Sequence, residues 1–248
     1  MNFQGTRPVD AAQPGRLLRP KSLTTLVVEE IRSRIVEGDL QLGETISENA
    51  LAQDLGISKT PVRDAMQQLR AEGLVDILPS RGTVVFSMSA DDVEQLGTYR
   101  ELLETAAVRL CMEREPSILA KGLAEVVGRM HPAIADDDLK VYRHLDADFH
   151  QCIFESSGNQ YLLEAYMRVS VRIQALRTRL SLDPKHIRDS YNEHIQMLDM
   201  VRGGRTDDLV ALMSFHVSNT KRSFLAKIGR LEDEHAASSR RQRISRPA

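Results

Sequence analysis

The hydrophobic positions in the first third of the chain follow the spacing of amphipathic helices. Four apolar residues recur at every fourth position, namely Leu23, Val27, Ile31 and Ile35. They predict a helix over 22–37, which Gly38 ends. Two shorter helices are predicted over 47–56 and 59–72, joined by a tight turn that contains glycine. This arrangement is typical of a helix-turn-helix.

The third of these helices has one apolar and one polar face. The apolar face is formed by Val62, Ala65, Met66 and Leu69, and the polar face by Lys59, Thr60, Arg63, Gln67 and Arg70. The polar face fits a recognition helix, whose first turns enter the major groove of DNA. An ordinary three-helix packing unit would also present a polar face, so this pattern alone does not decide between the two.

The segment that follows favours DNA binding. Two short apolar strands are predicted over 75–78 and 83–86, on either side of a Pro-Ser-Arg-Gly turn. They form a hairpin whose tip presents Arg81 and Gly82 to a phosphate or to the minor groove. The sequence therefore predicts a winged helix-turn-helix.

The rest of the chain shows helical periodicity and no strand pattern. Six helices are predicted, over 91–113, 117–135, 138–156, 160–180, 184–203 and 205–228, with breaks at Gly, Pro or Asp-rich positions. Helices of this length pack into a bundle around an apolar core. The expected fold class is mainly α, with an N-terminal winged helix-turn-helix and a C-terminal all-α bundle of about six or seven helices.

Composition and charge agree with this division. Aromatic residues make up 4% of the 248 residues and Trp is absent, which argues against a strand-rich protein. The net charge of −2 excludes a polybasic histone-like protein. We expect a flexible tail over 1–20, the DNA-binding domain over 21–86, a linker over 87–90, the helical domain over 91–228 and a flexible basic tail over 229–248.

The DNA-binding segment itself is slightly acidic. Residues 21–86 hold seven Lys or Arg and ten Asp or Glu, a net charge of −3. Attraction to DNA must therefore come from the positions of its few cations.

No signal-peptide pattern or membrane-spanning apolar run is present, and the two cysteines, Cys111 and Cys152, lie far apart in apolar stretches. We expect a cytoplasmic protein with two free thiols and no membrane partner.

One carboxylate and three imidazoles stand out as candidate metal ligands. Asp146 and His150 are four residues apart on one predicted helix, so both side chains can reach one point. His194 and His216 lie in the middle of two other helices. Together they form a plausible set for a divalent metal. A single histidine on a half-apolar face is more often a hydrogen-bonded structural residue, and this alternative stays open for each of them.

The N-terminal segment resembles a known family. The run ISENALAQDLGISKTPVRDAMQQLRAEGLVDILPSRGTVV is similar to the winged helix-turn-helix of the GntR family of bacterial transcription regulators. The resemblance implies operator contacts by Ser58, Lys59, Thr60 and Arg63, and a close approach of the wing glycine to DNA. That glycine is Gly82, and we add Gln67 and Arg81 as further DNA-binding candidates. Lys59 stands where arginine is more usual and lacks the planar fork that reads a base in two places.

The C-terminal segment resembles the FCD ligand-binding domain of the FadR-type branch of that family. The pattern YRELLETAAVRL, DADFHQCIFESSGN, EHIQML and FH carries the resemblance over about 90–228. It implies that Asp146, His150, His194 and His216 bind a metal and that Arg100 meets the carboxylate of an effector. The alternative for Arg100 is a salt bridge to Glu101 or Glu104.

These expectations combine into one functional hypothesis. The chain is predicted to be a transcription regulator, a repressor rather than an enzyme, that binds an inverted-repeat operator as a homodimer. A small organic acid bound at the divalent metal would modulate operator binding. Zinc is the default metal for such ligands, and nickel or manganese would also suit them. Two alternatives within the family are a purely structural metal and an apolar acyl effector, and a third is a metal-dependent hydrolase.

Overall fold

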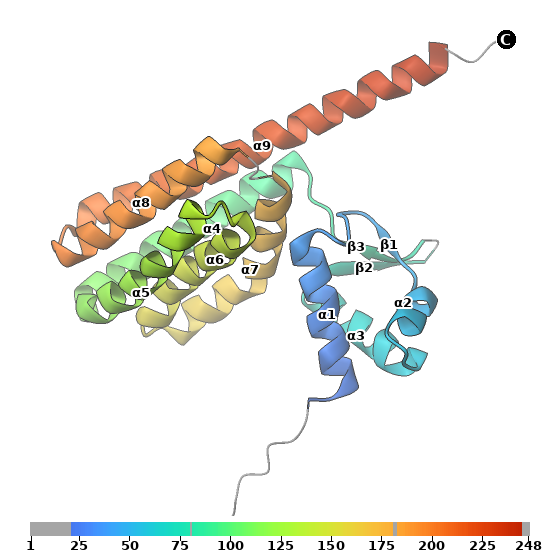
Figure 1. Cartoon of the computed structure of the whole chain (residues 1–248), viewed down its shortest axis with the longest axis horizontal. Helices are drawn as coiled ribbons and strands as arrows, with labels where there is room; N and C mark the ends of the chain where they lie inside the picture. Colours follow the sequence, from blue (N-terminus) through green and yellow to red (C-terminus); the bar gives the residue numbers. More distant parts are fainter. Residues whose placement is uncertain (1–20, 80, 181–182, 245–248) are drawn as a thin grey trace, which may run out of the picture.

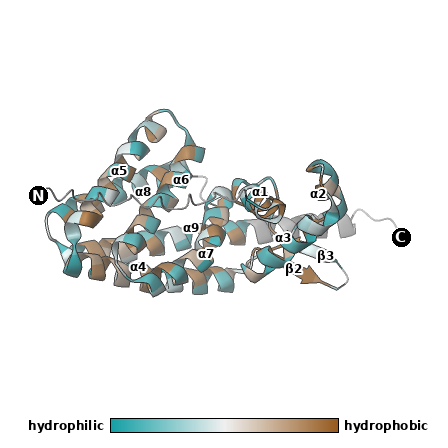
Figure 2. Cartoon of the chain, turned by 90° about the horizontal axis from the view of Figure 1, so that it is seen from below, coloured by the Kyte–Doolittle hydropathy of each residue, from teal (hydrophilic) through white to brown (hydrophobic). Residues whose placement is uncertain are grey.

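The computed structural model describes residues 21–79, 81–180 and 183–244. The described chain is mainly α, as predicted, with a small sheet near its N-terminal end. A winged helix-turn-helix unit lies at one end of the molecule and a helical bundle at the other (Figures 1 and 2). Within the described ranges, no helix combines the length and apolarity that crossing a membrane requires. The predicted tail over 1–20 lies outside the described residues.

Three helices build the winged unit: α1 (Leu23–Glu37), α2 (Glu48–Asp54) and α3 (Lys59–Ala71). Ser22 and Ser47 cap α1 and α2, because each hydroxyl accepts a hydrogen bond from a backbone N–H of the first turn. The apolar faces of the helices meet in one core, whose most deeply buried members include Ile31, Ile35, Val62, Met66 and Leu69.

The wing is an antiparallel hairpin of β2 (Val75–Leu78) and β3 (Gly82–Val85), in which Leu78 pairs with Gly82. Gly82 has a φ of 75°, a left-handed conformation that favours glycine at the tip. A strand that the sequence did not predict, β1 (Thr45–Ile46), pairs with the other side of β3. The strand order is therefore β1-β3-β2.

Six helices form the bundle: α4 (Ala90–Arg114), α5 (Pro116–Ala135), α6 (Leu139–Ser156), α7 (Gln160–Leu180), α8 (Pro184–Arg202) and α9 (Thr206–Ile244). Each begins within one residue of its predicted start. Apolar and polar positions alternate along these helices (Figure 2), and the apolar stripes enclose one large core. Cys111 is buried in this core, Cys152 is half-buried, and both are free thiols.

Helix α9 is longer than predicted. We expected it to end near residue 228 and to be followed by a flexible tail, but the helix continues to Ile244 and projects beyond the bundle (Figure 1). Its final segment, 229–244, includes four Arg, two Ala and two Glu, and no proline occurs between Pro184 and Pro247. These residues have high helix propensity, so the segment has no local reason to end the helix.

Helix α7 joins the bundle to the winged unit. It lies against α1 (Figure 1), and its Ala175 is part of the hydrophobic core of the winged unit. Arg179 donates from one guanidinium nitrogen to the backbone carbonyls of Ile35 and Leu40, at the C-terminal end of α1. Arg172 donates from Nε to the carbonyl of Gly73, at a distance of 2.9 Å. Both domains therefore share α7 as a common packing element.

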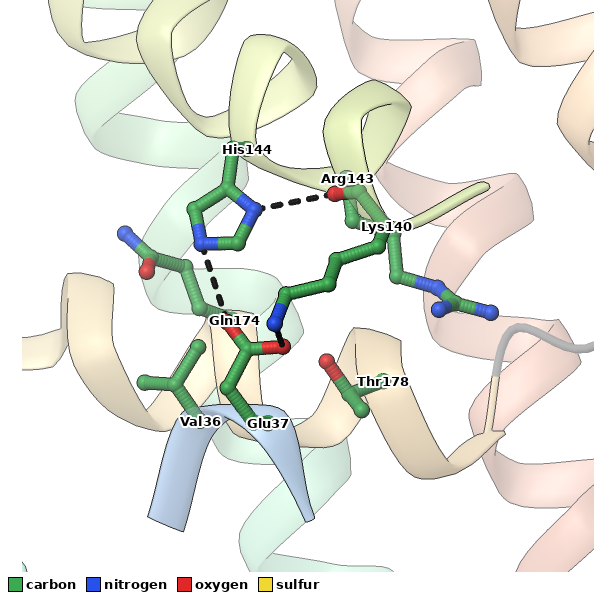
Figure 3. Close-up of a pocket in the computed structure, with 7 residues that line it drawn as sticks. All are labelled: Val36, Glu37, Lys140, Arg143, His144, Gln174 and Thr178. Atoms are coloured by element: carbon green, nitrogen blue, oxygen red, sulfur yellow. Dashed lines mark hydrogen bonds and ion pairs between the residues drawn. The ribbon is translucent and has the colours of Figure 1, made fainter. Parts of the chain in front are cut away.

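A second contact between the domains surrounds Glu37, at the end of α1. The carboxylate lies 3.1 Å from Lys140 Nζ and 3.1 Å from His144 Nε2, both on α6 (Figure 3). We call Glu37, Lys140, His144 and Arg179 the junction. The junction fixes the C-terminal end of α1 to both α6 and α7.

Candidate metal centre and DNA-binding face

The four predicted metal ligands converge in the core of the bundle. Asp146 and His150 project from the same face of α6, while His194 comes from α8 and His216 from α9. All four side chains are buried, and one ligand atom of each lies within 4.8 Å of those of the other three. The structure thus brings together every residue of the predicted set. That they bind a metal stays a prediction.

Two carboxylates that the sequence analysis did not assign to the site orient the imidazoles. Glu104 on α4 lies 2.6 Å from Nδ1 of His150, and Glu193 on α8 lies 2.6 Å from Nδ1 of His216. An ionised carboxylate only accepts hydrogen bonds, so each Nδ1 carries the proton and each Nε2 carries a lone pair. The two Nε2 atoms lie 3.3 Å apart. Two lone pairs that face each other at this distance fit a shared cation, and carboxylate partners of this kind are typical of metal-bound histidines.

His194 supplies a further observation in favour of a cation. Its ring packs against Phe149, with ring centroids 4.1 Å apart, and Nε2 lies 3.6 Å from Oδ1 of Asp146. Among the described residues, neither of its ring nitrogens has a hydrogen-bond partner. A buried polar group without a partner is costly, and a metal ion would satisfy one of these nitrogens.

Burial keeps the imidazoles neutral, which is the form that binds a metal. It lowers the pKa of His194 to about 3 and that of His216 to about 4, and holds the pKa of His150 well below its usual range. Burial is the largest single influence and would raise the pKa of Asp146, but Arg177 and the three neighbouring imidazoles together outweigh it, so the pKa of this carboxyl is lowered. The cluster therefore combines three neutral imidazoles and one carboxylate at neutral pH.

Two buried arginines flank the cluster. Arg100, the predicted effector contact, is 3% exposed and forms a salt bridge with Glu104 at 2.7 Å. This is one of the two salt bridges considered as its alternative role. Arg177 on α7 was not predicted, and its Nε lies 2.8 Å from Oδ2 of Asp146. A sequence signal for Arg177 existed, because it is a cation on the apolar face of an amphipathic helix.

The predicted DNA-binding residues share one exposed face. Ser58 is the N-cap residue of α3, Lys59, Thr60 and Arg63 lie in its first two turns, and Gln67 lies further along it. Arg81 and Gly82 lie at the wing tip, and all of these residues are exposed. The side chain of Arg63 is 66% exposed, and its only ion pair among the described residues is a long one, 3.5 Å from the carboxylate of Glu48. The guanidinium is therefore accessible to a DNA phosphate. Ser80 at the wing tip lies outside the described residues.

A winged helix-turn-helix with exposed cations on its third helix, joined to a helical bundle with a buried polar cluster, defines a DNA-binding transcription regulator. Comparison with known proteins agrees. Residues 23–85 match the family model "Bacterial regulatory proteins, gntR family", and residues 95–219 match the FCD domain. The chain belongs to the GntR family and carries an FCD domain.

Individual relatives support this assignment. The chain is 26% identical over 199 residues to the gluconate operon transcriptional repressor of Bacillus subtilis, covering 76% of this chain and 81% of the relative. The fold is similar to that of a GntR regulator from Rhodococcus sp. RHA1, with a TM-score of 0.73, 21% identity, and coverage of 82% of this chain and 97% of the other. It is also similar to McbR/YncC of E. coli, with a TM-score of 0.71, 20% identity, and coverage of 83% and 98%. The matched families and relatives are transcription regulators rather than enzymes, as predicted.

Proposed function

We propose that this protein is a transcriptional repressor whose affinity for its operator is set by a small organic acid, bound beside a divalent metal in the bundle core. The observation that carries the proposal is the convergence of four buried ligand atoms within 4.8 Å of one another. The repressor assignment is supported by the gluconate operon repressor among its relatives.

The metal would be held by Asp146 and by Nε2 of His150 and His216, with His194 as the fourth ligand. The donor set fits zinc, and nickel or manganese would also suit three imidazoles and a carboxylate. The bound ion would supply a positive charge that attracts a carboxylate. The residues around the cluster are charged and polar, which favours an organic acid over an apolar acyl effector.

The junction offers a route from the metal centre to the DNA-binding unit. Helix α6 carries both Asp146 and, two residues earlier, His144, which pairs with Glu37 at the end of α1. Helix α7 carries both Arg177 and, two residues later, Arg179, which holds the carbonyls at the same end of α1. A ligand that changes the relative position of α6 and α7 would therefore change the contacts that the junction makes with the C-terminal end of α1. Coupling of about 1–3 kcal/mol would alter operator affinity about 5- to 150-fold.

On the DNA side, we propose that a homodimer places two copies of α3 in successive major grooves of an inverted repeat. Ser58, Lys59, Thr60, Arg63 and Gln67 of α3 would contact the operator, and Arg81 and Gly82 of the wing would approach the phosphates or the minor groove. Two-fold protein symmetry matches the symmetry of such operators. The few cations of one winged unit would bind weakly alone.

Operator binding by wild type and variants tests the proposal. The operator is selected from random DNA, and fluorescence anisotropy then follows its binding with and without zinc and a panel of organic acids. Arg63→Ala should lose operator affinity, whereas Arg109→Ala, an exposed arginine of the bundle, is the matched control and should not. His194→Ala should keep DNA binding but lose metal and the response to acids.

Two outcomes would contradict the proposal. If Arg63→Ala binds the selected operator as wild type does, α3 is not the recognition helix. If metal removal melts the bundle and no acid alters operator binding of the loaded protein, the metal is structural.

A further inference from the structure

We propose that Arg172 fixes the orientation of the winged unit on the bundle and thereby determines which spacing of operator half-sites the repressor binds. This inference rests on the proposed function, in which a homodimer binds an inverted repeat. It goes further in assigning a role in operator specificity to a residue that lies outside both the recognition helix and the metal cluster.

The Arg172 side chain occupies a position on the winged unit that a glycine leaves open. Its Nε donates to the carbonyl of Gly73 at 2.9 Å, in the turn that follows α3. A Cβ atom at Gly73 would lie 1.5 Å from a terminal nitrogen of Arg172, which is far closer than two atoms can approach. Because the guanidinium is the far end of a flexible side chain, a larger residue at position 73 would displace it from the turn.

The same guanidinium also reaches the end of the wing. Its central carbon lies 6.0 Å from the ring centroid of Phe86, at the outer limit of a cation–π contact. Phe86 directly follows β3, belongs to the core of the winged unit, and donates its N–H to the carbonyl of Leu74 at 3.0 Å. One side chain of α7 therefore contacts both the turn after α3 and the end of the wing hairpin.

Arg172 and Arg179 hold the winged unit at two separate points of one helix. Arg179 binds the carbonyls of Ile35 and Leu40 at the C-terminal end of α1, where the other residues of the junction also lie. The two arginines are seven residues apart, which is about 10 Å along α7. Attachment at the end of α1 alone would let the winged unit rotate about that point. The second attachment, at Arg172, fixes its orientation.

The space beside Arg172 leaves room for such a rotation. A groove of about 1070 Å³ lies between the winged unit and the bundle, lined by Glu72 and Gly73 on one side and by Tyr99 and Met167 on the other. Tyr99 and Met167 are exposed. Among the described residues, the hydrogen bond from Arg172 to Gly73 is the only hydrogen bond or ion pair that joins α3 or the wing to the bundle. Its loss would therefore free this side of the winged unit.

A fixed orientation makes operator affinity depend on the spacing of the half-sites. One added base pair moves a half-site about 3.4 Å along the DNA and rotates it about 35° around the axis. A dimer whose winged units cannot rotate is unable to follow this displacement, so it loses the contribution of its second half-site. Winged units that rotate on the bundle can follow it, and their affinity changes less with spacing.

Fluorescence anisotropy with the full-length protein tests this role. The selected operator is made with its own spacer, with one base pair more, with one base pair fewer, and as a single half-site. Wild type should bind the selected spacing about 10- to 100-fold more tightly than either altered spacing. Arg172→Ala should reduce this preference to about 3-fold or less. It should leave affinity for the single half-site unchanged, because α3 keeps all of its own residues.

Matched variants separate the contact from general damage. Gly73→Ala should have the same effect as Arg172→Ala, and the double variant should behave like either single one, since both changes remove the same contact. Gly43 also has a left-handed backbone, with a φ of 77°, but nothing lies within 4 Å of a Cβ there. Gly43→Ala therefore has similar backbone strain and should keep the preference. Arg168→Ala removes an exposed arginine one turn earlier on α7, from the same groove, and should also keep it.

The possible results separate the inference from the proposed function. If Arg172→Ala keeps the spacing preference of wild type, or if wild type has no such preference, the inference is wrong. Equal loss by Arg172→Ala on every spacing and on the single half-site would also contradict it, because Arg172 would then support the fold of the winged unit and not its orientation. If Arg63→Ala binds the single half-site as wild type does, the recognition helix of the proposed function is wrong.

Discussion

Acidifying the metal-free protein from pH 7.5 to pH 5.5 is expected to cost the bundle about 4 kcal/mol of folding free energy. The three cluster imidazoles have lowered pKa values in the folded state, about 3 for His194 and about 4 for His216, with His150 well below its usual range. In the unfolded chain their pKa is about 6.5. Between these values the unfolded state binds more protons than the folded state, so stability falls as the pH falls.

The magnitude follows from proton linkage. At pH 5.5 an imidazole of the unfolded chain is about nine-tenths protonated. Each imidazole that stays neutral in the folded state therefore lowers the free energy of unfolding by about 1.4 kcal/mol between pH 7.5 and pH 5.5. Three of them give about 4 kcal/mol. Asp146 adds nothing to this change, because its lowered pKa stabilises the folded state at every pH above the usual aspartate value. The loss is a large fraction of the stability of a typical domain.

Urea unfolding of chelator-treated protein, followed by circular dichroism at both pH values, measures the effect. The double variant His194→Gln/His216→Gln is the control, and its stability should change about 3 kcal/mol less between the two pH values. A change in wild type below about 1 kcal/mol would refute the reasoning, because the imidazoles would then not be buried and neutral.

Three further predictions follow from particular contacts. Glu104→Gln should lower zinc affinity about 10- to 100-fold in a competition titration, because it weakens the orientation of His150, and unchanged affinity would exclude that role. Glu37→Gln should leave operator affinity without ligand within a few fold but reduce the response to an acid, since the junction loses its charge; an undiminished response would exclude this route. Leu69→Ala should cost the winged unit about 2–5 kcal/mol in urea unfolding, because Leu69 is fully buried in its core.

The parts of the fold that depend on local sequence were predictable. Helix starts follow from capping residues such as Ser22 and Ser47, which act within one turn. Strand β1 was missed because two residues, Thr45 and Ile46, are too few to show a period, and pairing with β3 defines the strand. The continuation of α9 is not predictable from composition alone, because polar, charged segments are typical of disordered tails, whereas these residues also favour a helix.

The sequence predicted the four candidate metal ligands of the site but not the residues that surround them. The four-residue spacing of Asp146 and His150 and the mid-helix positions of His194 and His216 indicated the set, and the family resemblance strengthened it. The orienting carboxylates could not be found in this way, because Glu104 meets His150 from a helix 46 positions away and no spacing reveals the contact. Arg177 was missed for the same reason, since its partner Asp146 lies on another helix.

The central claim is tested most directly by crystals of the zinc-loaded protein, measured at the zinc absorption edge. The account predicts one strong anomalous peak per chain, within bonding distance of Asp146 and of the three imidazoles of His150, His194 and His216. A map with no peak at this place, or with the only peak elsewhere on the chain, would contradict it.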